Sequence, residues 1–131
     1  MYLLDTNICL YLIKERPEAV LKNLRKKRSK GIAISSITLA ELEYGVENSK
    51  FPEKNKIALI KFLSIITILP FEAKAAEAYG KIKADLKRRG RIIGPLDILI
   101  AAHAKSEDLV LVTNNTREFE RIADVKIENW M

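Results

Sequence analysis

The chain of 131 residues has little of the chemistry that disulfides and zinc sites require. Cys9 is its only cysteine and His103 its only histidine. A single cysteine forms no disulfide within its own chain, and zinc sites in proteins are built mainly from several cysteine and histidine ligands. We therefore expect a protein of a reducing compartment in which Cys9 belongs to the core, and any bound metal should be held by oxygen atoms.

Long uncharged apolar segments are also missing from the sequence. No run approaches the ~20 apolar residues that cross a bilayer. The chain opens on MYLLDTN, without the basic and apolar regions of a secretory signal. Repeats and glycine-rich or serine-rich linkers are absent as well. These absences predict a cytoplasmic protein with no membrane partner, folded as one domain over residues 1–131.

Positive charge, in contrast, is abundant and unevenly distributed. The net charge is +6, and residues 14–30 hold eight lysines and arginines against two glutamates. Residues 81–91 hold six against one aspartate. Each run is either a solvated helix face or a footprint for phosphate groups. Neither run is regularly interleaved with aromatic residues, so base stacking has little support from the sequence.

Short apolar segments alternate with longer amphipathic ones along the whole chain. The pattern predicts strands at residues 2–4, 31–34, 65–71, 109–112 and 125–127. It predicts helices at residues 8–14, 17–28, 37–48, 53–64, 73–89, 95–106 and 116–122. This alternation indicates an α/β fold in three layers, with a mostly parallel sheet of about five strands between two layers of helices.

Polar residues follow several of these strands, where a parallel sheet binds its ligands. Asp5 follows the first strand, Glu41 lies shortly after the second, and Asp97 opens the helix that leads to the fourth. The segment from Thr113 to Glu118 follows that fourth strand. Each acid also has a structural interpretation: Asp5 could cap a helix, Glu41 and Glu118 could each complete a capping box, and Asp97 could offset a helix dipole.

Asp97 is the most informative of these acids because it enters an apolar helix, GPLDILIAAHA. The helix-dipole benefit of about 0.3–1 kcal/mol is small beside the several kcal/mol that a poorly paired charge costs near a dry core. Several carboxylates at one edge also repel each other, and a cation would relieve the repulsion. Oxygen ligands favour Mg²⁺ or Mn²⁺. His103 lies about 120° around the helix from Asp97, so we expect it outside this site.

Four motifs in order resemble the PIN-domain ribonucleases, and among them the VapC toxins of toxin–antitoxin pairs. They are LLDTN with Asp5, ISSITLAELEYG with Glu41, GPLDILIAAHA with Asp97, and LVTNNTREFERI near the end. The resemblance extends over essentially the whole chain. It implies a PIN domain over residues 1–131 and a Mg²⁺- or Mn²⁺-dependent endoribonuclease toxin acting on structured RNA. A tRNA anticodon loop, and that of initiator tRNA in particular, is the leading candidate substrate.

The resemblance also implies roles for individual residues. Asp5, Glu41 and Asp97 match the family's metal-binding catalytic acids. The auxiliary polar residues around them are Thr6, Asn7, Thr113 and Asn115. The basic runs would hold the RNA backbone, with Lys87, Arg88 and Arg89 as the candidate RNA-binding residues.

At the fourth acidic position this chain departs from the family pattern. Many relatives have an aspartate two residues after the threonine that Thr113 matches, and here that place is Asn115. Glu118 is the nearest replacement and therefore a further candidate catalytic acid, whereas Glu120 is less favoured. Because an amide binds Mg²⁺ more weakly than a carboxylate does, the departure leaves open whether one or two ions bind.

The resemblance further implies a cognate VapB-type antitoxin, contact with operator DNA only through that antitoxin, and a homodimer. Two alternatives remain from the residues themselves. One is a non-catalytic RNA-binding module with the same fold. The other is a phospho-receiver domain, which should show a paired acid near Asp5 and a lysine after a late strand, where this chain has Thr113 and Asn114.

Overall fold

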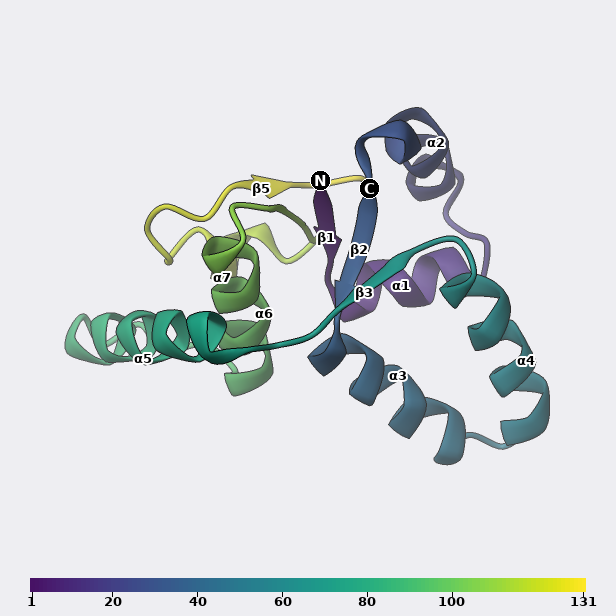
Figure 1. Ribbon diagram of the computed structural model, residues 1–131, viewed down its shortest axis with the longest axis horizontal. Helices are drawn as coiled ribbons and strands as arrows, with labels where there is room; N and C mark the ends of the chain where they lie inside the picture. The colour runs from purple at the N-terminus through teal and green to yellow at the C-terminus, as the bar shows by residue number, and fades with distance from the viewer.

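The computed structural model describes residues 1–131 and alternates strands with helices (Figure 1). The strands are β1 (Tyr2–Leu4), β2 (Ile32–Ser35), β3 (Thr67–Leu69), β4 (Val110–Val112) and β5 (Ile127–Glu128). The helices are α1 (Thr6–Ile13), α2 (Glu18–Lys27), α3 (Ser36–Glu47), α4 (Pro52–Leu63), α5 (Ala73–Arg88), α6 (Pro95–Ser106) and α7 (Thr116–Phe119), with a short 3₁₀ helix, η1 (Arg28–Lys30), after α2. Every predicted segment is present, but β3 and α7 are shorter than the predicted 65–71 and 116–122.

All five strands are parallel, in the order β3-β2-β1-β4-β5. The predicted three-layer α/β/α fold is thereby confirmed. β1 lies at the centre of the sheet, where Leu3 is in register with Ala33 of β2 and with Leu111 of β4. Because the strands run in the same direction, all of their carboxyl ends lie at one edge, where Asp5 and Thr113 follow β1 and β4 directly.

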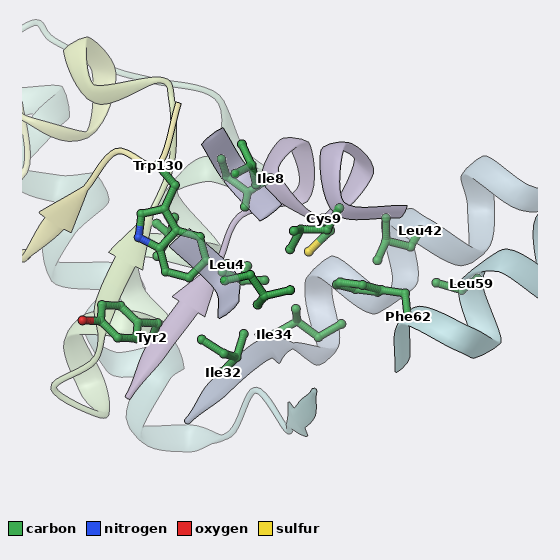
Figure 2. Close-up of a cluster of buried hydrophobic side chains, with 14 of the residues drawn as sticks. Tyr2, Leu4, Ile8, Cys9, Ile32, Ile34, Leu42, Leu59, Phe62 and Trp130 are labelled. Atoms are coloured by element: carbon green, nitrogen blue, oxygen red, sulfur yellow. The ribbon is translucent and has the colours of Figure 1, made fainter. Parts of the chain in front are cut away.

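Alternate side chains of the strands enter two separate hydrophobic clusters. Tyr2 and Leu4 belong to the cluster under α1, α2, α3 and α4, whereas Leu3 belongs to the cluster under α5, α6 and α7. Figure 2 shows the first cluster, in which Trp130 packs beside Tyr2 at one end. The Cys9 side chain is fully buried there, as expected.

The helix that carries Asp97 is the most deeply buried one of the second cluster. Ile98, Ile100, Ala101 and Ala102 of α6 are each at most 1 % exposed, and α5 packs along this helix. Because α6 is packed on several sides, its first turn, which carries Asp97, has a defined position at the edge of the sheet. None of the helices combines the length and the apolar composition needed to cross a membrane.

Candidate active site

Asp5 is buried at the junction of β1 and α1, and both of its carboxylate oxygens accept hydrogen bonds. Oδ1 accepts from the backbone N–H of Ile8 at 3.0 Å, so Asp5 does cap α1. Oδ2 accepts from the Thr113 hydroxyl at 2.5 Å. Burial raises the pKa of Asp5, and the bond from Thr113 partly offsets that rise. Capping and a site role are compatible here because each carboxylate oxygen offers more than one lone pair.

Glu41 reaches the same edge from the second turn of α3. The capping-box interpretation of Glu41 is wrong, because Ser35 is the residue that caps this helix and its hydroxyl accepts from the Ile37 N–H at 3.1 Å. Thr38 lies inside the helix and is fully buried. The Glu41 side chain instead accepts a hydrogen bond from the Thr6 hydroxyl at 2.9 Å. It is thus held against the first turn of α1, next to Asp5.

Asp97 is the third residue of α6, whose first turn opens with Gly94 and Pro95. Burial raises the pKa of Asp97 to about 6, with further contributions from a hydrogen bond to Glu118 and from the charges of Glu118, Asp5 and Glu41. Burial and the neighbouring carboxylates thus both disfavour the charged form of Asp97, which a nearby cation would favour. Helix-dipole compensation alone does not explain Asp97, since it would favour the ionised form.

Glu118 lies beside Asp97, at the place where the sequence departs from the family pattern. Asn115 occupies the N-cap position of α7 without a capping bond from its side chain. Its amide Nδ2 donates to Glu118 Oε2 at 3.0 Å, which orients the carboxylate. Glu120 is exposed at the C-cap of α7. The structure therefore brings Glu118 to the acidic group and leaves Glu120 away from it.

Three of these acids, Asp5, Glu41 and Asp97, line a cavity of about 330 Å³, whereas Glu118 is not part of its lining. It is lined by Asp5, Thr6, Asn7, Glu41 and residues 94–97. The lining contains three carboxylates and no lysine, arginine or histidine. The sequence did not predict that residues 94–96 form one wall of this cavity. The only indication in the sequence is that Gly94 and Pro95 begin the helix that carries Asp97.

The donor set of this cavity suits a hard divalent cation, because every polar side chain in its lining offers oxygen. No three acidic, histidine or cysteine side chains of the structure surround a common point as metal ligands. Ionised acids repel each other, and the Thr113 and Thr6 hydroxyls hold Asp5 and Glu41 in place by hydrogen bonds. Mutual repulsion and the raised pKa of Asp97 would both be relieved by a cation drawing the carboxylates together.

The other residues singled out from the sequence lie outside this cavity. His103 is buried, and its Nδ1 lies 2.7 Å from the Ser35 hydroxyl. Lys87 and Arg88 are exposed at the end of α5. Arg89 is engaged, since it binds the Asp85 carboxylate at 2.7 Å and donates to the backbone carbonyl of Arg121.

Comparison with known proteins identifies the class that this sheet and this acidic edge define. A family model described as PIN domain matches residues 2–125. The Ribonuclease VapC2 of Haemophilus influenzae is 50 % identical over 130 residues, covering 99 % of this chain and 98 % of the relative. The tRNA(fMet)-specific endonuclease VapC of Shigella flexneri is 46 % identical over 129 residues, covering 98 % and 97 %.

The solved structures agree with these relatives. One solved structure is VapBC2 from Rickettsia felis bound to a DNA fragment from its promoter. A chain of that complex superposes on this protein with a TM-score of 0.95 at 47 % identity, and the match covers 99 % of this chain and 98 % of that one. A DNA-bound VapBC from Salmonella typhimurium gives a TM-score of 0.94 at 45 % identity, covering 99 % and 98 %. The chain belongs to the PIN-domain family, among its VapC ribonucleases.

Proposed function

We propose that this protein is the endoribonuclease toxin of a VapBC toxin–antitoxin pair and hydrolyses phosphodiester bonds in structured RNA. The observation that carries the proposal is the cavity at which Asp5, Glu41 and Asp97 meet, in a fold shared with VapC ribonucleases. A tRNA anticodon loop is the substrate we favour. Initiator tRNA is the specific candidate, because two relatives at 46 % identity are named tRNA(fMet)-specific endonucleases.

Asp5, Glu41 and Asp97 would hold Mg²⁺ or Mn²⁺. Such an ion, when bound, lowers the pKa of water and stabilises charge on the phosphate. The side chains and backbone of the protein contribute by orienting these acids. The Ile8 N–H and the Thr113 hydroxyl orient Asp5, and the Thr6 hydroxyl orients Glu41. These fixed hydrogen bonds hold the acids in place before the substrate arrives.

Glu118 supplies the fourth acidic group in place of the amide of Asn115. Burial, together with a hydrogen bond to Glu118 and the charges of the neighbouring acids, raises the pKa of Asp97. Since the pKa of Asp97 is about 6, Asp97 keeps its proton in mild acid and releases it near neutral pH. Cation binding should therefore release a proton and weaken as the pH falls below 6.

A VapB-type antitoxin is the partner that we propose for this chain. A groove of about 450 Å³ between α1, α2 and α4 has a mainly apolar lining that includes Leu12, Leu21, Ile57, Phe62 and Ile65. The Ile57 side chain is 59 % exposed, which suits it to an apolar segment of a partner. We also propose a homodimer that contacts operator DNA only through the antitoxin, and a cytoplasmic location, where tRNA is found.

The two alternatives make different demands on the site. A phospho-receiver domain needs a lysine beside its aspartate; the cavity has none, and the chain belongs to another family. A non-catalytic RNA-binding module would not need three acids around one cavity, which repel phosphate unless a cation is present.

Cleavage of defined transcripts tests the proposal. The purified protein should cut initiator tRNA with Mg²⁺ or Mn²⁺ and lose activity with a chelator, and mapping of the new 5′ ends should place the cut in the anticodon loop. Elongator methionine tRNA is the matched control because it has the same anticodon. The Asp5→Asn variant should fold normally and leave both transcripts intact. Tight binding of tRNA without cleavage would favour the RNA-binding module instead.

A further inference from the structure

A second cavity adjoins the acidic one along α1. Its volume is about 500 Å³, and its lining consists of Asn7, Leu10, Tyr11, Lys14, Arg16 and Pro17. Asn7 lines both cavities, so they meet at this residue. The charges are opposite: the first cavity contains three acids and no cation, and the second contains two cations and no acid.

The two cations of this second cavity are available to a ligand. Lys14 and Arg16 are exposed, and neither belongs to any of the six ion pairs of the structure. Arg89, in contrast, is paired with Asp85. Lys14 follows Asn7 by seven residues, which is about 10 Å along a helix. A chain that crosses the acidic cavity would therefore meet these cations a short distance further on.

Tyr11 gives the cavity an aromatic wall with a fixed position. The Tyr11 hydroxyl accepts a hydrogen bond from the Asn114 side chain at 3.2 Å. Asn114 directly follows Thr113, the residue that holds Asp5. Two consecutive residues after β4 thus position both the buried acid and the aromatic ring.

We propose that this second cavity binds the nucleotide next to the scissile phosphate of a single-stranded RNA segment. Lys14 and Arg16 hold its phosphate, and its base packs against the Tyr11 ring. The inference rests on the proposed RNA cleavage and extends it to a substrate subsite. Unpaired loop bases are splayed out and stack on aromatic side chains, while the backbone follows cationic grooves. A cation-lined cavity beside an acidic one matches that arrangement.

Binding of a labelled initiator tRNA anticodon stem-loop, measured by fluorescence anisotropy, tests the role of the cations. The measurements are made in the Asp97→Asn background so that the RNA is not cut. Lys14→Gln with Arg16→Gln should raise Kd about tenfold at low salt. It should also flatten the salt dependence, by about 0.7 in slope for each phosphate that the protein no longer neutralises.

Lys30→Gln with Lys105→Gln is the matched control. Both lysines are exposed and belong to none of the six ion pairs. The control removes the same charge from residues that precede β2 and β4, at the opposite edge of the sheet. This control should retain the parent affinity and salt slope, and circular dichroism should confirm that both double variants are folded.

Tyr11 is tested separately, because stacking and charge give different results. Tyr11→Ala should weaken binding about tenfold with an unchanged salt slope. Tyr11→Phe, which keeps the ring and loses only the hydroxyl, should stay close to the parent.

The outcomes separate the subsite from the proposed function. Wild-type cleavage of the RNA combined with unaltered binding by the folded Lys14/Arg16 variant overturns the subsite and leaves the function standing. Binding that depends on Lys14, Arg16 and Tyr11 without any cleavage by the wild type overturns the nuclease and retains the subsite. No binding and no cleavage overturns both.

Discussion

Asp97 keeps its proton at a pH at which an ordinary aspartate is ionised. Its folded-state pKa of about 6 lies above the usual 3.8. Asp97 therefore favours the folded state fully below pH 3.8, and this contribution is lost as the pH rises through 6. At neutral pH, without a cation, the ionised Asp97 is a source of instability in the fold.

Asp97→Asn should accordingly raise the melting temperature of the cation-free protein at pH 7. The gain should be about 4 °C, corresponding to about 1 kcal/mol once solvent screening of this half-exposed group is allowed for. The gain should disappear near pH 4, where Asp97 is largely protonated in the folded state. Differential scanning calorimetry at both values, with chelator, makes the comparison. A lower melting temperature for the variant at pH 7 would mean that Asp97 serves mainly as a structural residue.

Comparing Glu118 with Glu120 tests which glutamate belongs to the acidic group. Glu118 lies beside Asp97 and accepts from Asn115, whereas Glu120 is exposed. Glu118→Gln should reduce cleavage at least tenfold and shift its Mg²⁺ dependence to higher concentration, while Glu120→Gln should change neither. Rates measured over a Mg²⁺ series decide the matter. An unaltered Mg²⁺ curve for Glu118→Gln would remove Glu118 from the catalytic group.

At the level of elements, Ser35 connects the two helices that carry Glu41 and Asp97. Its hydroxyl caps α3 by accepting from the Ile37 N–H and lies 2.7 Å from His103 Nδ1 on α6. Ser35→Ala should lower the free energy of unfolding by about 1–2 kcal/mol, because a helix cap is removed and a buried histidine nitrogen is left without its partner. Denaturant titration measures the loss. Ser35→Thr, which keeps the hydroxyl, should recover part of it, and equal losses for both variants would contradict the role of the hydroxyl.

The sequence was most informative about the strands and helices. Alternation of apolar and amphipathic segments was enough to predict five strands and seven helices, and the parallel-sheet rule placed Asp5, Glu41 and Asp97 at one edge. The cap of α3 was not predictable in this way. It depends on the residue at which β2 ends, and both Ser35 and Thr38 are acceptable caps by residue type.

Contacts between distant residues were beyond prediction for a related reason. The bond from Arg89 to the carbonyl of Arg121 joins residues 32 positions apart, and no local pattern indicates it. The cavity of Lys14, Arg16 and Tyr11 likewise depends on how α1 meets the segment after β4. Composition identified a basic run there but not which of its members remain unpaired.

For the molecule as a whole, a net charge of +6 surrounds an acidic cavity. The charge should attract RNA from a distance, while the three carboxylates of the cavity should repel its phosphates unless a cation is bound between them. Because Arg89 is already paired with Asp85, we expect only Lys87 and Arg88, which are exposed at the end of α5, to contact RNA there.

Lys87→Gln with Arg88→Gln should weaken tRNA binding and lower its salt slope without moving the cleavage position, since phosphate contacts carry no base information. Arg89→Gln should change the melting temperature more than the salt slope, because its bonds are internal. Anisotropy over a salt series, together with 5′ end mapping, measures these effects. A changed cleavage position for the Lys87/Arg88 variant would show that these residues do more than hold the backbone.

The central place of β1 in the sheet has a consequence for how the protein is made. β1 is flanked by β2 and by β4, which both follow it in the chain, and Asp5 is held by Thr113, 108 positions later. A growing chain therefore has no complete acidic site until nearly all of it has been synthesised. Under the proposed function, we therefore expect the chain to cleave no RNA while its own translation is still in progress.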